Sequence, residues 1–274
     1  MLLDAVTWPL VLELLALGSV VGVLAGLLGI GGGMIMVPFL TLMLEHRGVP
    51  TAMAMKMAIA TAMATITVTS LSSLRAHHAR GAVRWPVVAG MAPGVVLGGL
   101  VAGAGVFALL KGKVLGFVFA GFLLFSALQM ALDRKPKPSR STPGPLGLAS
   151  AGGVIGLVSG LVGAGGGFLT VPFLVWRNVP VHQAVGTSAA LGFPIALAAT
   201  AGYVIGGWRL PPALPGAFGY LYLPALVLIM ATSMWTAPLG VRLAHALNVA
   251  QLKRGFAVVL VGLAVTMFYK ALHA

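Results

Sequence analysis

The sequence contains no cysteine and very few acidic residues. Among 274 residues there are only 4 Asp and Glu and no Cys, so disulfide bonds, thiol catalysis and cysteine metal sites are excluded. Charged residues of both signs make up only 8% of the chain, too little for the surface of a water-soluble domain of this length. His77 and His78 have no partner ligand at zinc spacing, and we therefore expect no metal site.

Apolar residues dominate what remains. They form 59% of the chain, and the mean hydropathy is +1.04, which is typical of an integral membrane protein. The net charge of +13 comes from 17 Lys and Arg. These cations lie in short loops between apolar runs, as the positive-inside rule expects, and not in a polar cluster that would bind nucleic acid. We expect no nucleic-acid partner.

Ten apolar segments follow one another, five in each half of the chain. They cover residues 8–28, 34–44, 50–74, 86–110, 114–132, 146–162, 168–176, 181–205, 220–243 and 252–272. A proline-rich, charged stretch at residues 133–145 cannot be helical and marks the midpoint. The predicted fold is all-α, with a first repeat at residues 1–132, a cytoplasmic linker at 133–145 and a second repeat at 146–274.

One glycine-rich stretch occurs in both halves. Gly29-Ile30-Gly31-Gly32-Gly33 returns 134 residues later as Gly163-Ala164-Gly165-Gly166-Gly167, and each copy is followed by Val-Pro-Phe-Leu. A glycine triplet with a proline five residues after it is a poor helix former, so we predict a broken membrane segment in each half. Upstream, Gly18, Gly22 and Gly26 align with Gly152, Gly156 and Gly160, a spacing of four that predicts close helix packing.

The two short segments either cross the membrane or return to the side they left. Eleven helical residues rise roughly 16 Å, about half of a 30 Å hydrocarbon core, so crossing requires an extended glycine stretch. Crossing places 11 of the 17 cations on one face: Arg75, Arg80, Arg84, Arg134, Lys135, Lys137, Arg140, Arg177, Arg242, Lys253 and Arg254. We therefore predict crossing, with both termini outside. Five crossings per half make the two halves inverted repeats.

These motifs resemble the sulfite exporter TauE/SafE family of membrane anion permeases. The resemblance rests on Gly-Leu-x-Gly-x-Gly-Gly-Gly-x-x-x-Val-Pro-Phe-Leu from Gly26 and from Gly160, and on Val-Pro-x-x-x-Ala after each copy. Ala-Val-Gly-Thr-Ser at 184–188 and Leu-Gly-Val-Arg-Leu-Ala at 239–244 add to it. The resemblance covers nearly the whole chain, and it implies transport of small sulfur-containing or carboxylate anions such as sulfite, sulfonates and sulfoacetate.

The glycine triplets are the first candidate site. Gly31, Gly32, Gly33, Gly165, Gly166 and Gly167 can leave backbone N–H groups free at the start of a short helix, where the helix dipole favours an anion. In the crossing topology both helix N-termini meet near the midplane. The alternative is that the triplets only allow close helix packing.

Three side chains complete the predicted site. Lys56 is a cation inside an apolar run, and a charge within a membrane segment suggests a functional role. The alternative interpretation is that its side chain snorkels to the nearer membrane interface. Thr187 and Ser188 occupy the matching depth of the second half, where Gly-Thr-Ser replaces Lys-Met-Ala. Their hydroxyls can donate hydrogen bonds to an anion, or can bond to their own helix. We predict an asymmetric site with Lys56 as its charge anchor.

The predicted function is translocation of a small sulfur-containing or organic anion across a bacterial inner membrane. The alternatives are an uncoupled anion channel and an intramembrane enzyme, and the second lacks a constellation of His, Asp, Glu and Ser residues. Neither triplet completes a dinucleotide-binding motif or a P-loop, so we expect no cofactor. The expected partners are the small anion and the lipid bilayer, with a homodimer left open.

Overall fold

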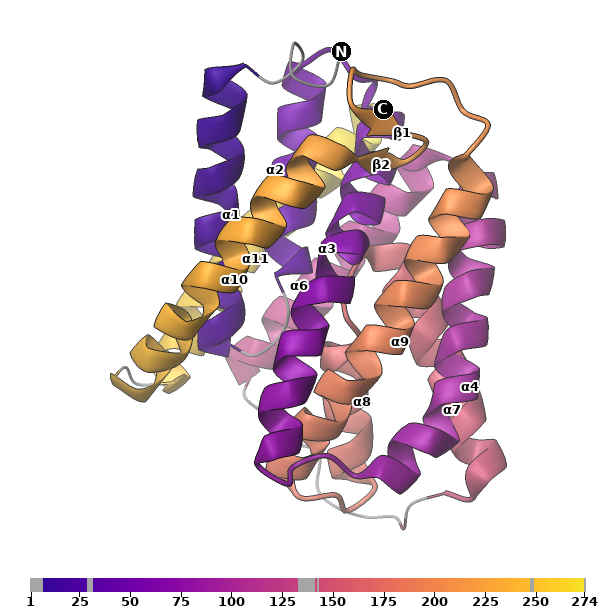
Figure 1. Cartoon of the computed structure of the whole chain (residues 1–274), viewed down its shortest axis with the longest axis vertical. Helices are drawn as coiled ribbons and strands as arrows, with labels where there is room; N and C mark the ends of the chain where they lie inside the picture. The colour runs from indigo at the N-terminus through magenta and orange to yellow at the C-terminus, as the bar shows by residue number, and fades with distance from the viewer. Residues whose placement is uncertain (1–6, 29–31, 133–140, 142, 247–248, 274) are drawn as a thin grey trace.

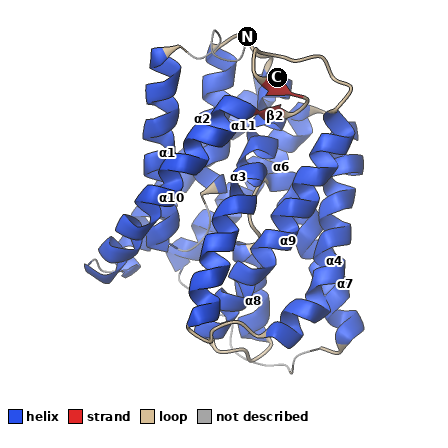
Figure 2. Cartoon of the chain, in the orientation of Figure 1, coloured by secondary structure: helices blue, strands red, loops and turns tan. Residues whose placement is uncertain are grey.

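The computed structural model of the chain describes residues 7–28, 32–132, 141, 143–246 and 249–273. These residues form a helical bundle (Figures 1 and 2). The elements are α1 (Trp8–Leu28), α2 (Gly33–His46), α3 (Thr51–Ala79), α4 (Trp85–Leu100), the π-helix η1 (Val101–Val106), α5 (Phe107–Leu109), α6 (Gly112–Leu132), α7 (Pro145–Val162), α8 (Gly167–Trp176), α9 (Val181–Gly207), β1 (Ala217–Phe218), β2 (Leu221–Tyr222), α10 (Leu223–Ala246) and α11 (Val249–His273).

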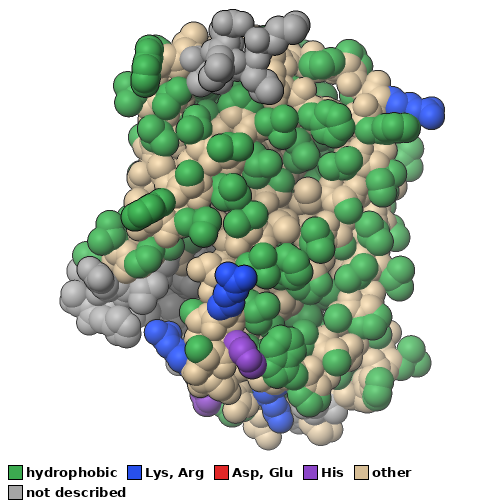
Figure 3. Space-filling view, viewed as in Figure 1, with side chains coloured by type: hydrophobic (Ala, Val, Ile, Leu, Met, Phe, Trp, Pro, Cys, Tyr) green, Lys and Arg blue, Asp and Glu red, His purple; other side chains and the backbone are tan. Residues whose placement is uncertain are grey.

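Eight of the described helical stretches are long and apolar enough to cross a membrane. They are α1, α3, α6, α7, α9, α10, α11 and the run formed by α4, η1 and α5. On the face shown in Figure 3, hydrophobic side chains are spread over the whole height of the molecule, and most visible Lys, Arg and His side chains lie toward the lower end. The prediction of an all-α integral membrane protein is confirmed.

The short helices α2 and α8 are the two broken segments. Both begin at the last glycine of a triplet, Gly33 and Gly167. Glycine is a poor helix former, so the triplet interrupts the preceding helix and the next helix starts only after it. In Figure 1, α1 starts and α2 ends at the upper end of the molecule, whereas α7 starts and α8 ends at the lower end. Each short helix therefore returns to the end from which the helix before it started.

This arrangement agrees with the order of ends expected if the short segments cross. The end of α3, the start of α4 and the end of α8 lie at the lower end in Figure 1, and the end of α11 lies at the upper end. One detail differs from the sequence prediction. The basic stretch from Arg75 is not all loop, because α3 continues to Ala79 and stops before Gly81, whose φ of +64° suits glycine.

The helices of the two halves pack against each other in reciprocal pairs. α1 packs on α10, α4 on α7, α3 on α9 and α6 on α11. If α1 corresponds to α7, α3 to α9, α4 to α10 and α6 to α11, exchanging the halves leaves this set of pairs unchanged. The pairing is the one expected of inverted repeats, and the repeat itself stays a prediction.

Glycines allow the close approach of these pairs. A Cβ added to Gly22 would lie 2.7 Å from the Ser233 Cα on α10, and one added to Gly156 would lie 2.8 Å from the Val95 Cα on α4. Any larger residue would push the paired helices apart. These two glycines correspond at the 134-residue offset, so the packing interpretation of the upstream glycines is supported in both halves.

Candidate functional site

The two glycine breaks lie against each other inside the bundle. A Cβ added to Gly33 would overlap the carbonyl oxygen of Gly163. The Ile66 side chain, midway along α3, reaches both breaks, since it would lie 3.1 Å from that Cβ and 3.2 Å from one added to Gly165. Gly31 lies outside the described residues. The starts of α2 and α8 are thus brought together, as expected for helices that start inside the bundle.

The second break has the geometry of an open helix N-terminus. Gly163 (φ +68°) ends α7, and Gly166 (φ +78°) is the N-cap of α8. The Gly166 carbonyl accepts from the Thr170 N–H at 2.8 Å, and no side chain caps the helix. The first N–H groups of an α-helix have no acceptor within the helix. Those of Gly167 and Phe168 are therefore donors that a ligand can use.

Two serine hydroxyls flank this helix N-terminus. The Ser159 Oγ on α7 lies 3.3 Å from the position of a Cβ on Gly166, and the Ser188 Oγ on α9 lies 3.7 Å from one on Gly167. Among the described residues, Ser159 and Thr170 are buried hydroxyls that have no hydrogen-bond partner. Thr170 lies one turn into α8.

The first break lacks these polar groups. Ser159 and Thr170 correspond at the 134-residue offset to Ala25 and Met36. Ser188 corresponds to Ala58 at an offset of 130, which is the spacing of the Val-Pro pairs at 49–50 and 179–180. A side chain added at Gly32 would overlap Val21. The two breaks therefore share a backbone pattern, but only the second carries hydroxyl groups. Comparing the two halves at every position, and not only at 186–188, would have identified Ser159 and Thr170 from the sequence.

The Thr187 hydroxyl bonds away from the breaks, unlike the hydroxyl of the neighbouring Ser188. The Thr187 Oγ1 accepts a hydrogen bond from the Arg84 backbone N–H at 3.0 Å, which ties α9 to the residue before α4. Thr187 lies in the second turn of α9 and Arg84 directly precedes α4, and both helices start at the lower end in Figure 1. Thr187 and Ser188 are adjacent in the sequence, yet they serve different surroundings because successive helix positions point about 100° apart.

Lys56 lies near the opposite end of the molecule from Thr187. Its Nζ donates to the carbonyl oxygen of Ala108 at 3.1 Å and lies 5.8 Å and 5.5 Å from the ring centres of Phe107 and Tyr220. Carbonyl oxygens and aromatic faces both stabilise a cation. Burial raises the pKa of the Tyr220 phenol, so the ring stays neutral at physiological pH. The structure does not bring Lys56 together with Thr187 or Ser188.

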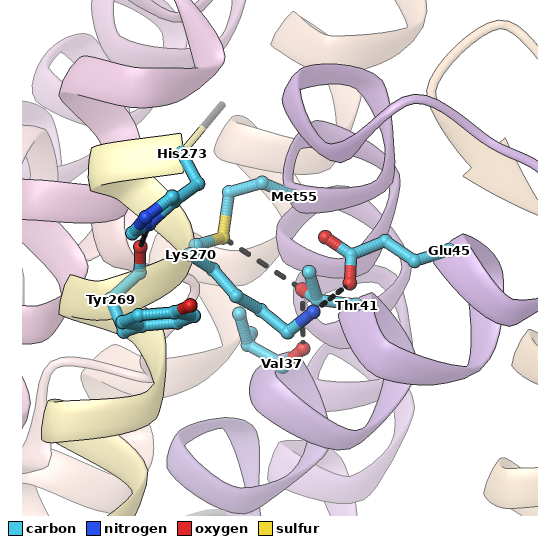
Figure 4. A network of polar contacts seen from close by, with 7 residues as sticks. All are labelled: Val37, Thr41, Glu45, Met55, Tyr269, Lys270 and His273. Carbon is cyan, nitrogen blue, oxygen red and sulfur yellow. Dashed lines mark hydrogen bonds and ion pairs between the residues drawn. The ribbon is translucent and has the colours of Figure 1, made fainter.

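A polar network fixes the outer end of α2 (Figure 4). Glu45 forms an ion pair with Lys270 of α11, and Arg47 pairs with Glu13 of α1 at 3.2 Å. One turn before Glu45, the Thr41 Oγ1 donates to the Val37 carbonyl at 2.8 Å. Half of the four acidic residues of the chain therefore hold this one short helix in place.

No metal cluster is present in the described part of the chain, since no three His, Asp or Glu side chains there come together. The acids that are described are paired with cations at the end of α2. The chemistry that the second break offers is hydrogen-bond donation from backbone amides and hydroxyls, which suits an anion with several acceptor oxygens.

Comparison with known proteins agrees with this description. Residues 14–267 match the family model for the sulfite exporter TauE/SafE family. The chain is 35% identical over 261 residues to a probable membrane transporter protein of Haemophilus influenzae, covering 95% of this chain and 98% of that one. It is 26% identical over 241 residues to a probable membrane transporter protein of Methanocaldococcus jannaschii, covering 84% and 85% of the two chains. No solved structure matches the chain significantly.

Proposed function

Because the chain belongs to the sulfite exporter TauE/SafE family of membrane transporters, we propose that it carries a small sulfur-containing or organic oxyanion across a bacterial inner membrane. The substrates that we propose are sulfite, a sulfonate or sulfoacetate. The observation that carries the proposal is the uncapped N-terminus of α8 inside the bundle, with Ser159 and Ser188 beside it.

A helix N-terminus inside a membrane protein is an unusual source of positive potential. It is equivalent to roughly half an elementary charge, and it acts most strongly where water is excluded. The amides of Gly167 and Phe168 point along the helix axis toward the break, where an anion oxygen can accept their hydrogen bonds. Broken helices that offer such ends are the usual binding elements of transporters with repeated halves.

The position of the site within the bundle suits alternating access. The second break contacts the first through Gly163 and Gly33, α3 passes beside both breaks, and α9 passes beside the second. A relative movement of the two halves about this contact would expose the N-terminus of α8 first to one end and then to the other. By the positive-inside rule, the lower end in Figure 1 faces the cytoplasm.

The test is uptake of radiolabelled sulfite or a sulfonate into liposomes that contain the purified protein. Gly167→Leu should abolish saturable uptake, because its side chain would fill the space in front of the amides. Gly167 tolerates a Cβ, which would meet only the Ser188 Oγ at 3.7 Å, so we expect the variant to fold.

Gly121→Leu is the matched control, since a Cβ there has no neighbour within 4 Å and the position lies on an exposed face of α6. It should transport like the wild type. Normal uptake by Gly167→Leu would show that the second break only serves packing. Uptake that never saturates would instead indicate a channel.

A further inference from the structure

The Ser159 hydroxyl is buried in a place where helix bonding does not satisfy it. Ser159 is 1% exposed, and in the described part of the chain its Oγ has no hydrogen-bond partner. A serine inside a helix usually bonds to the carbonyl four residues earlier, as Ser150 of the same helix does to Leu146 at 2.8 Å. Ser159 instead turns its Oγ toward Gly166, the N-cap of α8.

A buried hydroxyl without a partner lowers the stability of the folded protein. A buried hydroxyl of this kind therefore calls for an explanation, and one explanation is that a bound ligand forms the missing hydrogen bond. The N-terminus of α8, which no side chain caps, lies next to the Ser159 hydroxyl, and Ser188 approaches it at Gly167. The two hydroxyls, one from α7 and one from α9, therefore flank the same position.

Among the described residues, the side chains that approach this position carry no charge. The buried polar side chains in the described part of the chain are Ser, Thr and Tyr, all of them neutral, and the Tyr203 hydroxyl already donates to the Gly160 carbonyl. The partly buried cations have other partners: Lys56 bonds to Ala108, Arg47 pairs with Glu13, and Lys270 pairs with Glu45. The positive end of α8 supplies only about half a charge, and the C-terminal end of α7 at Gly163, with the opposite sign, reduces it.

From these facts, and resting on the proposed function, we infer that the site binds a singly charged oxyanion through the Ser159 and Ser188 hydroxyls and the α8 amides, and discriminates against dianions. Neutral donors and a partial dipole charge can stabilise one negative charge. Among the proposed substrates, such a site therefore favours hydrogensulfite and simple sulfonates over sulfoacetate, which carries two negative charges at neutral pH. A second charge would have to leave water without a cation to balance it, which is costly in a buried site. Ser159 is thus a specificity-determining residue that the paired glycine motif does not contain.

The experiment uses methanesulfonate and sulfate as probes, because both present sulfur-bound oxygens and differ in charge. Isothermal titration calorimetry on the full chain in nanodiscs should give a dissociation constant for methanesulfonate at least about tenfold lower than for sulfate. Ser159→Ala should weaken methanesulfonate binding by about 2- to 10-fold, the loss expected for one neutral hydrogen bond.

Ser150→Ala, on the exposed side of the same helix, is the control and should bind like the wild type. The melting temperature of ligand-free Ser159→Ala should not fall, because the hydroxyl has no partner to lose. A structural role for Ser159 would lower that temperature and leave the ratio of the two affinities unchanged.

Three results would overturn the inference. Sulfate binding as tightly as methanesulfonate would remove the charge discrimination, and unchanged affinity in Ser159→Ala would remove the residue from the site. In both cases loss of uptake in Gly167→Leu would leave the proposed function standing. If neither probe binds and Gly167→Leu transports normally, the proposed function fails together with the inference.

Discussion

At the scale of single residues, the Lys56 amine has a partner of its own, far along α3 from the second break. Lys56 lies in the second turn of α3, with its amine on the Ala108 carbonyl. Ser70 of the same helix lies level with the second break, because a Cβ added to Gly192 would lie 3.6 Å from the Ser70 Cβ and 3.4 Å from the Gly165 carbonyl oxygen. Ile66 also reaches both breaks, so ten to fourteen residues of helix place Lys56 about 15–21 Å away along α3.

We therefore expect Lys56→Met to change the dissociation constant for the anion by no more than about sevenfold. Two unit charges about 15–21 Å apart interact by roughly 0.8–1.1 kcal/mol at an effective dielectric constant of about 20. A direct contact, as the sequence alone suggested, would cost about 1.5–3 kcal/mol, or 10- to 150-fold. Titration calorimetry with wild type, Lys56→Met and Lys56→Arg decides between them. A loss of tenfold or more in the Met variant would return Lys56 to the binding site.

At the scale of elements, α2 is a short helix held at one end by ion pairs and free of side-chain caps at the other. The Glu45 side chain is only 14% exposed and its Oε1 has no partner in the described structure, whereas Glu13 is 54% exposed. The Glu45–Lys270 pair is therefore the one whose loss leaves a charge poorly solvated. The Glu13–Arg47 pair is largely screened by water.

We expect Lys270→Met to lower the free energy of unfolding by about 1–3 kcal/mol, because it strands the Glu45 carboxylate. Thermal unfolding in detergent measures this change. Adding Glu45→Gln should restore part of the lost stability, since the uncompensated charge is then removed. Glu13→Gln serves as the comparison and should cost less than about 1 kcal/mol. Equal losses in the two pairs, or additive effects of the double substitution, would show that Glu45 is not held by Lys270.

At the scale of the whole molecule, the pairing of α1 with α10 and of α4 with α7 joins the two halves. Neither half is a separate layer, because each helix hairpin closed by a glycine break packs on a helix of the other half. A bundle built this way places the end of α6 and the start of α7 at one end, and the start of α1 and the end of α11 at the other (Figure 1).

Membrane topology tests this arrangement and the orientation given by the basic residues. Single cysteines at Ser141 and His273, introduced into this cysteine-free chain, should react differently with an impermeant maleimide in intact cells. Both positions are exposed. His273→Cys should be labelled and Ser141→Cys protected until the membrane is opened, because the positive-inside rule predicts that the basic end faces the cytoplasm. Equal labelling of both in intact cells would contradict an odd number of crossings between them.

The sequence alone determined the class of protein and the order of its segments. The expected run 8–28 has the bounds of α1, and the run 168–176 differs from α8 by one residue. Hydropathy and glycine content act locally, because a segment in lipid must satisfy its own backbone hydrogen bonds whatever its neighbours are. The two glycine breaks were visible for the same reason, since a triplet weakens a helix wherever it occurs.

The tertiary structure decided which polar groups share one place. Thr187 bonds to Arg84, 103 residues away in the sequence, and Lys56 bonds to Ala108, 52 residues away. Ser159 and Ser188 come to the same helix N-terminus because α7 and α9 both pass it. A hydroxyl or an amine carries no sign of its partner in its own sequence neighbourhood. The partner is set by how apolar helices pack, and the small glycine contacts between the halves fix that packing.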